Sequence, residues 1–289
     1  MWSRIADLAS DIKLSHSVFA LPFALLGMTL AAGSVGRVPT WATFGLILAC
    51  MVLARTVAMA MNRWADASFD ARNPRTAFRA IPSGRLTRPF VLGAAVVCSL
   101  GFVLATGAFW WINDNVLPLV FSPLVLAWLV GYSFTKRVTW LCHLFLGSAL
   151  AISPIAAAVA TQPSFVAEPD VHWLAAMVLC WVAGFDILYA LQDVEIDRRD
   201  GLHSMPANLG ISRALWAGRF LHVLCIAALV MLVINSEQLG PIFSVGIAIT
   251  AGLLTLEHWL VWRSPVNRIP VIFVTVNGVI SVLLGGLGV

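Results

Sequence analysis

Charged residues are scarce in this sequence. Of its 289 residues, 11% are Asp, Glu, Lys or Arg and 60% are hydrophobic. A soluble domain carries about 25% charged residues, so this composition excludes a soluble domain and indicates a polytopic membrane protein. The net charge of +4 would also suit a nucleic-acid partner, but the basic residues lie in short loops between apolar runs. That distribution is a membrane-topology signal and predicts no nucleic-acid binding.

Cysteine pairs of the kind that bind metals or form disulfide frameworks are also missing. The five cysteines all fall inside apolar runs, without C-x-x-C spacing: Cys50, Cys98, Cys142, Cys180 and Cys225. We therefore expect free thiols in helices, neither disulfides nor metal ligands.

What the sequence has instead is a series of long apolar runs. A hydrocarbon core about 30 Å thick needs about 20 helical residues to cross it. Nine runs approach this length and predict an all-α protein with nine transmembrane helices: 15–33, 41–61, 90–111, 115–132, 139–160, 171–191, 212–234, 239–261 and 269–288. No soluble domain or linker is visible, so we expect a single transmembrane domain over residues 1–289.

The segment before the first run, MWSRIADLASDIKLS, has a different pattern. Asp7 and Asp11 are unlike the apolar region of a cleaved signal peptide. Ile5, Leu8 and Ile12 fall on one face of a helix. The segment therefore predicts an amphipathic helix at the membrane interface.

The basic residues define a topology for nine helices. With the N-terminus on side one, alternate loops place nearly all of them on that side: Arg4, Lys13, Arg63, Arg72, Arg75, Arg79, Arg85, Arg88, Lys136, Arg137, Arg198, Arg199, Arg213, Arg263 and Arg268. Side two receives only Arg37. The bias predicts that side one is cytoplasmic.

Two polar triplets stand at helix ends on that side. In MNRWADASFD, Asn62, Asp66 and Asp70 are four residues apart, and in DILYALQDVEID the residues 189, 193 and 197 repeat the spacing 127 residues later. A basic loop follows each triplet. The halves 15–132 and 139–261 therefore predict two parallel four-helix repeats around a central cavity, with 269–288 as a last helix.

The spacing of the carboxylates has a chemical consequence. Residues i and i+4 share a helix face about 5–6 Å apart, and two carboxylates that close favour a cation between them. Mg²⁺ takes hard oxygen ligands, commonly one or two carboxylates completed by water and phosphate oxygens. Two facing pairs, Asp66 with Asp70 and Asp193 with Asp197, could hold Mg²⁺ ions bridged by a diphosphate. Basic residues nearby would neutralise the remaining phosphate charge.

A plainer interpretation is that these aspartates are solvated loop residues paired with neighbours such as Arg63 and Arg72. The recurrence of the spacing at helix exits argues against it. Asp186 lies one to two turns deeper than Asp193 on much the same face, and an acid inside a membrane helix is commonly functional.

These stretches resemble the UbiA superfamily of intramembrane prenyltransferases. Asn62-x-x-x-Asp66-x-x-x-Asp70 with NPRTAFRAIPSGRL is similar to its first signature, and YALQDVEIDRRDGLHSMP to its second. GYSFTKRVTWLCHLFLGSALAISP resembles the stretch between them. The resemblance covers nearly the whole chain. It implies a nine-helix bundle that binds a polyprenyl diphosphate through Mg²⁺ and transfers the prenyl group to a small aromatic acceptor.

The resemblance also implies residue roles. Asp66, Asp70, Asp193 and Asp197 match the metal–diphosphate positions, together with Asn62. Further positions match the basic residues expected to hold diphosphate: Arg75, Arg79, Lys136 and Arg137. Tyr132 and Tyr189 match aromatic positions near the reacting carbon. Asp186 or Asp193 is a candidate for the base that removes the ring proton.

The acceptor is less defined by the sequence. DIKLSHSVFALPFALLG departs from the arginine-containing stretch of the 4-hydroxybenzoate branch, but Lys13 and His16 would still suit an acidic aromatic acceptor. We expect Mg-dependent prenylation of an acid such as 4-hydroxybenzoate in quinone biosynthesis, at the cytoplasmic side of a bacterial inner membrane. A dihydroxynaphthoate-type menaquinone precursor is the alternative acceptor.

An ion-coupled transporter is the alternative class, because repeats and intramembrane carboxylates occur there too. Transporters usually place these charges near the bilayer midplane on broken helices. Here the carboxylates stand at helix exits beside Arg-rich loops, which favours a phosphate ligand. His143, His172, His222 and His258 lack ligand spacing and are expected to be structural.

Overall fold

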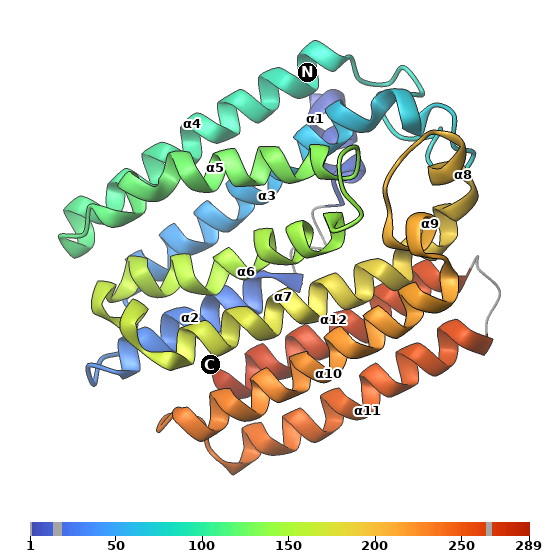
Figure 1. Ribbon diagram of the computed structural model, residues 1–289. Helices are drawn as coiled ribbons and strands as arrows, with labels where there is room; N and C mark the ends of the chain where they lie inside the picture. The colour runs from blue at the N-terminus through green and yellow to red at the C-terminus, as the bar shows by residue number, and fades with distance from the viewer. Residues whose placement is uncertain (1, 14–18, 264–267) are drawn as a thin grey trace.

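The computed structural model describes residues 2–13, 19–263 and 268–289 (Figure 1). Within these ranges the chain is helical and contains no strand. Eight helical segments are long and apolar enough to cross a membrane, and a shorter apolar helix, α2, precedes them. The protein is therefore an integral membrane protein with an all-α fold.

Most of the helices follow one another with short connections, whereas the α3–α4 loop covers residues 71–87. Their bounds are α1 Trp2–Asp11, α2 Leu21–Gly33, α3 Trp41–Asp70, α4 Arg88–Asn113, α5 Leu117–Thr135, α6 Cys142–Thr161, α7 Pro169–Ala190, α8 Val194–Arg199, α9 Met205–Leu209, α10 Ile211–Asn235, α11 Pro241–Arg263 and α12 Ile269–Gly288. Two 3₁₀ turns, η2 Pro163–Ala167 and η3 Leu191–Asp193, lie on either side of α7.

The predicted spans differ from these helices in two places. The run 15–33 corresponds to α2, of which only Leu21–Gly33 is α-helical among the described residues. The run predicted to end at residue 61 continues as one helix to Asp70. Hydropathy falls after residue 61, but no proline or glycine interrupts the chain before Pro74, so the helix extends beyond its apolar part.

Threonine caps define where α3 and α4 begin. The Oγ1 of Thr40 accepts a hydrogen bond from the Thr43 N–H at 3.1 Å. Thr87 does the same for the Phe90 N–H at 3.4 Å, with a proline in the first turn of α4. Each cap satisfies one of the free N–H groups at a helix start.

Helix α7 forms the centre of the larger core. It packs against α6 and α10, and further against α12 and α2. Its Trp181 is fully buried, with its ring edge-on to Phe23 at 5.3 Å and to Phe185 at 5.1 Å. Gly147 of α6 allows close approach, because a Cβ there would lie 2.5 Å from the Leu179 carbonyl oxygen. Small residues at such crossings are typical of membrane helices.

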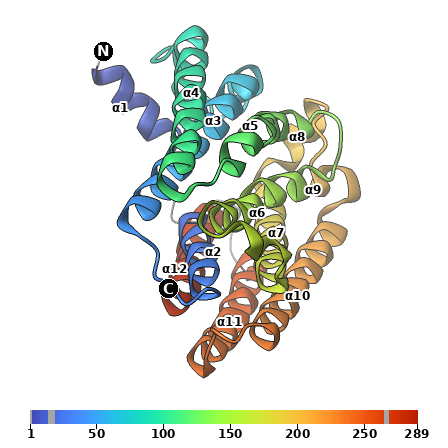
Figure 2. The same cartoon turned by 90° about the vertical axis from the view of Figure 1, so that its left-hand side faces the viewer.

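A second core joins α1 to α3 and α4. Leu8 and Ile12 are buried beside Val57 and Met61, whereas Ile5 is 46% exposed. Figure 2 shows α1 standing at the side of the bundle next to α3 and α4. The predicted amphipathic helix is thus present, with Leu8 and Ile12 on its packed face.

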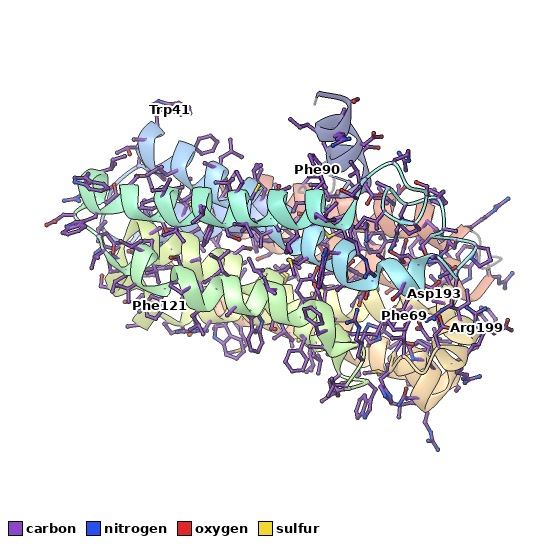
Figure 3. All side chains as sticks on the ribbon, turned by 90° about the horizontal axis from the view of Figure 1, so that it is seen from above. Trp41, Phe69, Phe90, Phe121, Asp193 and Arg199 are labelled. Carbon is purple, nitrogen blue, oxygen red and sulfur yellow. The ribbon has the colours of Figure 1, made fainter. Side chains whose placement is uncertain are left out.

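Both polar triplets lie at the same end of the bundle. The α3–α4 connection, α8 and α9 gather at the right of Figure 1. In Figure 3, Phe69 at the end of α3 lies near Asp193 and Arg199, and Trp41 marks the opposite end of α3. Segments far apart in sequence therefore build one polar region.

Candidate active site

The first triplet lies on three successive turns of α3. The Nδ2 of Asn62 donates to Asp66 Oδ2 at 3.1 Å. Asp70 is the last residue of the helix and is buried. Because the helix is unbroken to Asp70, all three side chains share one face.

The second triplet has the same spacing on a different backbone. Tyr189 belongs to α7, Asp193 ends the 3₁₀ turn η3, and Asp197 lies in α8. Both aspartates are buried. The predicted span 171–191 ends close to the end of α7, and the 3₁₀ turn η3 lies between the helices that carry Tyr189 and Asp197.

Each of the four carboxylates forms an ion pair with a basic residue. The pairs are Asp66–Arg137 at 3.2 Å, Asp70–Arg79 at 2.7 Å, Asp193–Arg75 at 2.5 Å and Asp197–Lys136 at 2.7 Å. Three of them join separate segments, so the α3–α4 loop, the α5–α6 turn and the η3–α8 region are tied together. The predicted diphosphate-binding residues and the predicted metal ligands thus lie in one cluster.

The Arg75 side chain forms three hydrogen bonds in this cluster. Its Nε and Nη2 donate to the two oxygens of Asp193 at 3.0 and 2.5 Å, and its Nη1 donates to the Tyr189 hydroxyl at 3.2 Å. Asn73 adds a hydrogen bond from its Nδ2 to Asp193 Oδ1 at 3.0 Å. This two-pronged geometry is the strongest form of arginine–carboxylate contact.

Two of the basic residues in this cluster, Arg75 and Lys136, have raised pKa values and remain protonated. Burial alone would lower the pKa of Arg75, but the hydrogen bonds and charge of Asp193 raise it. Burial alone would also lower the pKa of Lys136, but the negative charge of Asp197 outweighs this effect, and the pKa of Lys136 is raised. Both groups therefore present fixed positive charge to an anion.

The donor set is suited to Mg²⁺ in the presence of phosphate. No group of three or more His, Cys, Asp or Glu side chains able to hold a metal occurs among the described residues. Mg²⁺ commonly uses only one or two carboxylates and takes its other ligands from water and phosphates. Asp197 Oδ2 is buried and has no hydrogen-bond partner within the described part of the chain. The residues present therefore fit a metal bound together with a diphosphate.

Asp186 lies deeper, beside a histidine. His143 is buried, and its Nδ1 is 2.7 Å from Asp186 Oδ2. The N–H of Met205 donates to the other ring nitrogen, Nε2, at 3.1 Å. Because Nε2 accepts, the ring proton sits on Nδ1 and is donated to Asp186. From its sequence pattern His143 is expected to be structural, because spacing along the sequence does not reveal its contact with Asp186.

A second group of basic residues lies near the middle of α3, on the N-terminal side of the first triplet. Arg55, in the body of α3, donates from Nη2 to the Lys13 carbonyl at 3.1 Å. Its Nε is buried without a hydrogen-bond partner among the described residues. Tyr132 is within electrostatic range of Arg55 and Arg63. His16, the other predicted acceptor residue, lies outside the described residues.

Lys13 is exposed and ends the N-terminal segment in a left-handed conformation with φ 49°. Partial burial and the charges of Arg63, Arg79 and Arg75 lower its pKa. Its ammonium group is therefore repelled by the positive charges of these arginines, and a bound anion would reduce this repulsion. Arg55 was not among the site residues predicted from the sequence, although a charge about fifteen residues inside a membrane helix is itself a functional signal.

A salt-bridge triad holds the two motif loops together. Asp200 accepts from Arg72 Nε at 3.3 Å and from Arg199 Nε at 3.0 Å. Arg199 also donates to the Arg72 carbonyl at 3.1 Å. The hydrogen bond from Arg199 lowers the pKa of Asp200.

These observations define a polytopic membrane protein with an acidic and basic site at one end. The sequence model of the UbiA prenyltransferase family matches residues 20–279. The chain belongs to this family and is a prenyltransferase.

Relatives and solved structures agree with this assignment. The 4-hydroxybenzoate octaprenyltransferases of Pectobacterium atrosepticum and Tolumonas auensis are 28% and 29% identical, over 90% of this chain and 86% and 87% of theirs. The apo structure of a UbiA homolog from Aeropyrum pernix K1 has a TM-score of 0.83 at 31% identity, covering 94% of this chain and 96% of that one. A UbiA homolog from Archaeoglobus fulgidus bound to DMAPP and Mg²⁺ shares the fold, with a TM-score of 0.73 at 15% identity over 98% and 97%.

Proposed function

We propose that the protein transfers a polyprenyl group from a polyprenyl diphosphate to an aromatic acid such as 4-hydroxybenzoate, with Mg²⁺, as a step of quinone biosynthesis. The observation that carries the proposal is the cluster of four carboxylates, each paired with Arg or Lys, at one end of the bundle. The names of the 4-hydroxybenzoate octaprenyltransferase relatives support the choice of acceptor. The basic loops favour the cytoplasmic face of a bacterial inner membrane.

The diphosphate would be bound by exchange of partners within this cluster. Arg75, Arg79, Lys136 and Arg137 already present positive charge beside the carboxylates, and phosphate oxygens suit the same donors. The carboxylates released from them, Asp66, Asp70, Asp193 and Asp197, would hold Mg²⁺. When bound, Mg²⁺ supplies positive charge that stabilises the departing diphosphate. The two halves of the chain, 15–132 and 139–261, would contribute one carboxylate pair each as parallel repeats.

Aromatic rings near the cluster would stabilise positive charge on the prenyl carbon. Tyr189 packs against Phe273 with ring centroids 4.8 Å apart, and Arg75 lies 5.4 Å above its ring. Tyr132 is within electrostatic range of Arg55 and Arg63. A desolvated aromatic face attracts a cation by about 2 kcal/mol, which would favour loosening of the C–O bond.

The acceptor carboxylate would lie against the cationic region of Arg55 and Lys13. The Nε of Arg55 is a buried donor without a partner in the described part of the chain, and such a donor costs about 1–3 kcal/mol until it is satisfied. An aromatic carboxylate would satisfy it and would relieve the repulsion around Lys13. This arrangement favours an acidic acceptor over a neutral one.

Asp186 is the better candidate for the base that removes the ring proton. Asp193 is held by Arg75 and Asn73, which stabilise its charged form and make it a weak base. Among the described residues Asp186 receives one hydrogen bond, from His143 to its Oδ2, so its Oδ1 would be the atom that takes the proton. The hydrogen bond from His143 would hold Asp186 in one orientation.

An assay with purified protein tests this function. Labelled geranyl diphosphate and Mg²⁺ would be supplied with 4-hydroxybenzoate, a dihydroxynaphthoate or a neutral phenol. We expect a prenylated product with 4-hydroxybenzoate, and much less with the phenol. Preference for the dihydroxynaphthoate would move the protein to a menaquinone route, and absence of any product would contradict the proposal.

A further inference from the structure

We propose that Asp11, on the N-terminal helix, is a positioning residue for the carboxylate site and acts on Asp66 through Arg63 and Asn62. The inference rests on the function proposed above, because it assigns a role toward the same diphosphate site. It assigns α1 a role in orienting Asp66.

The first link is a buried ion pair between α1 and α3. Arg63 is 6% exposed, and its Nε lies 3.4 Å from Asp11 Oδ2. Nε and Nη2 also donate to the Asp11 carbonyl, each at 3.3 Å. The other carboxylate oxygen, Oδ1, accepts from the Ala80 N–H at 2.9 Å. Asp11 therefore joins α1, α3 and the α3–α4 loop, and it neutralises a charge that would be costly to bury alone.

The second link runs from Arg63 to the first triplet. Arg63 Nη1 donates to Asn62 Oδ1 at 3.0 Å, and Asn62 Nδ2 donates to Asp66 Oδ2 at 3.1 Å. A guanidinium group can only donate and a carboxylate can only accept. One orientation of the Asn62 amide satisfies both neighbours, with its NH₂ toward Asp66. Without Arg63 the amide is free to turn and place its carbonyl oxygen against that carboxylate.

Fixing the amide matters because Asp66 must exchange partners when ligand binds. Arg137 pairs with Asp66 at 3.2 Å and would move to phosphate. The Asn62 amide would then be the contact that keeps Asp66 oriented. Loss of outer groups that orient a metal ligand typically costs about 10- to 100-fold in metal affinity or activity.

A neighbouring ion pair provides a matched control. Asp7 also lies on α1, and its Oδ1 is 3.1 Å from Arg85 Nη1 in the same α3–α4 loop. This pair tethers the same helix to the same loop, and its hydrogen bonds include none to Asn62 or Arg63. Asp7→Asn therefore removes a tether and leaves the route to Asp66 intact.

The experiment measures the Kd of geranyl diphosphate with Mg²⁺ by calorimetry, together with Tm, for the full chain in detergent. Arg63→Gln should raise Kd about 10- to 100-fold, and Asp11→Asn about tenfold, as expected for groups behind a metal ligand. Asp7→Asn should leave Kd unchanged. Arg63→Gln added to Asn62→Ala should weaken binding no further, because the two act through one contact.

Other outcomes would overturn the proposal. Equal Kd values for Asp11→Asn and Asp7→Asn would mean that Asp11 only anchors α1. Additive effects of Arg63→Gln and Asn62→Ala on Kd would show that Arg63 does not act through Asn62. If Arg63→Gln does not fold, Arg63→Lys keeps the charge and should still weaken binding, since it loses the Nη1 group that donates to Asn62 Oδ1 while the rest of the side chain contacts Asp11. Failure of the wild-type protein to bind geranyl diphosphate would instead overturn the proposed function.

Discussion

Replacing Asp186 by Asn separates proton removal from diphosphate binding. The substitution keeps the shape of the side chain, and its Oδ1 can still accept the proton that His143 Nδ1 donates at 2.7 Å. What disappears is the anionic oxygen that would take the ring proton. General base catalysis contributes about 10²- to 10⁴-fold, so kcat should fall by about that factor. This corresponds to about 2.7–5.4 kcal/mol in the barrier, at 1.36 kcal/mol for each tenfold.

The assay is steady-state prenyl transfer with each substrate varied in turn. For Asp186→Asn, KM for the prenyl diphosphate should not change, because the hydrogen bonds and ion pairs of Arg75 and Lys136 described above go to Asp193, Tyr189 and Asp197 and not to Asp186. The matched variant Asp193→Asn should behave in the opposite way and raise that KM, since it removes one of the carboxylates that would hold Mg²⁺ with the diphosphate. Wild-type kcat in Asp186→Asn would refute the assignment of the base.

Three further predictions concern the site and its topology. Asp66→Ala should remove nearly all transfer activity while the protein keeps its Tm within a few degrees, and substantial remaining activity would argue that Asp66 holds no metal. Lys13→Ala should raise KM for the aromatic acid about 10- to 100-fold, since a hydrogen bond to a charged group contributes about 1.5–3 kcal/mol, without changing KM for the prenyl diphosphate. Because the pKa of Lys13 is lowered, the same KM should rise as pH increases, at a lower pH than an ordinary lysine pKa of about 10.4 would give. A KM independent of pH and of Lys13 would place acceptor binding elsewhere. Single-cysteine labelling should reach Ser83 and Ser204 from the cytoplasm and Ser164 from the other side, and opposite labelling of Ser83 and Ser204 would exclude a shared site.

The fold was largely predictable because it depends on hydropathy. Apolar runs of membrane length predict an all-helical membrane protein and the order of its helices; of the nine predicted spans, eight correspond to helices of membrane length among the described residues, and the first corresponds to the shorter α2. Helix ends were less predictable, as α3 shows: its last turns are polar, yet they remain helical to Asp70 because nothing in the chain breaks them.

The candidate site was predictable where chemistry repeats along the chain. Asp66 and Asp70 share spacing with Asp193 and Asp197, and that recurrence brought the four carboxylates into one hypothesis. Contacts between distant segments left no such pattern. The hydrogen bond of His143 to Asp186 spans 43 residues, and that of Arg63 to Asp11 spans 52. Only packing brings these groups together, so their partners appear in the structure and not in the sequence.

The interruption at Asp193 has the same origin. The spacing of the second triplet suggests one helix, but the 3₁₀ turn Leu191–Asp193 separates α7 from α8. Asp193 receives hydrogen bonds from Asn73 and Arg75 of the α3–α4 loop. The 3₁₀ turn therefore occurs together with these tertiary contacts, and helix propensity alone does not predict it.

The central claim is that this end of the bundle binds a diphosphate through metal and basic residues. Calorimetric titration of the purified wild-type protein with geranyl diphosphate, in Mg²⁺ and then in EDTA, tests it most directly. We expect saturable binding in Mg²⁺, its loss in EDTA, and its recovery when Mg²⁺ is restored. Equal affinity in EDTA would contradict the account, because the four carboxylates would then have no metal to hold.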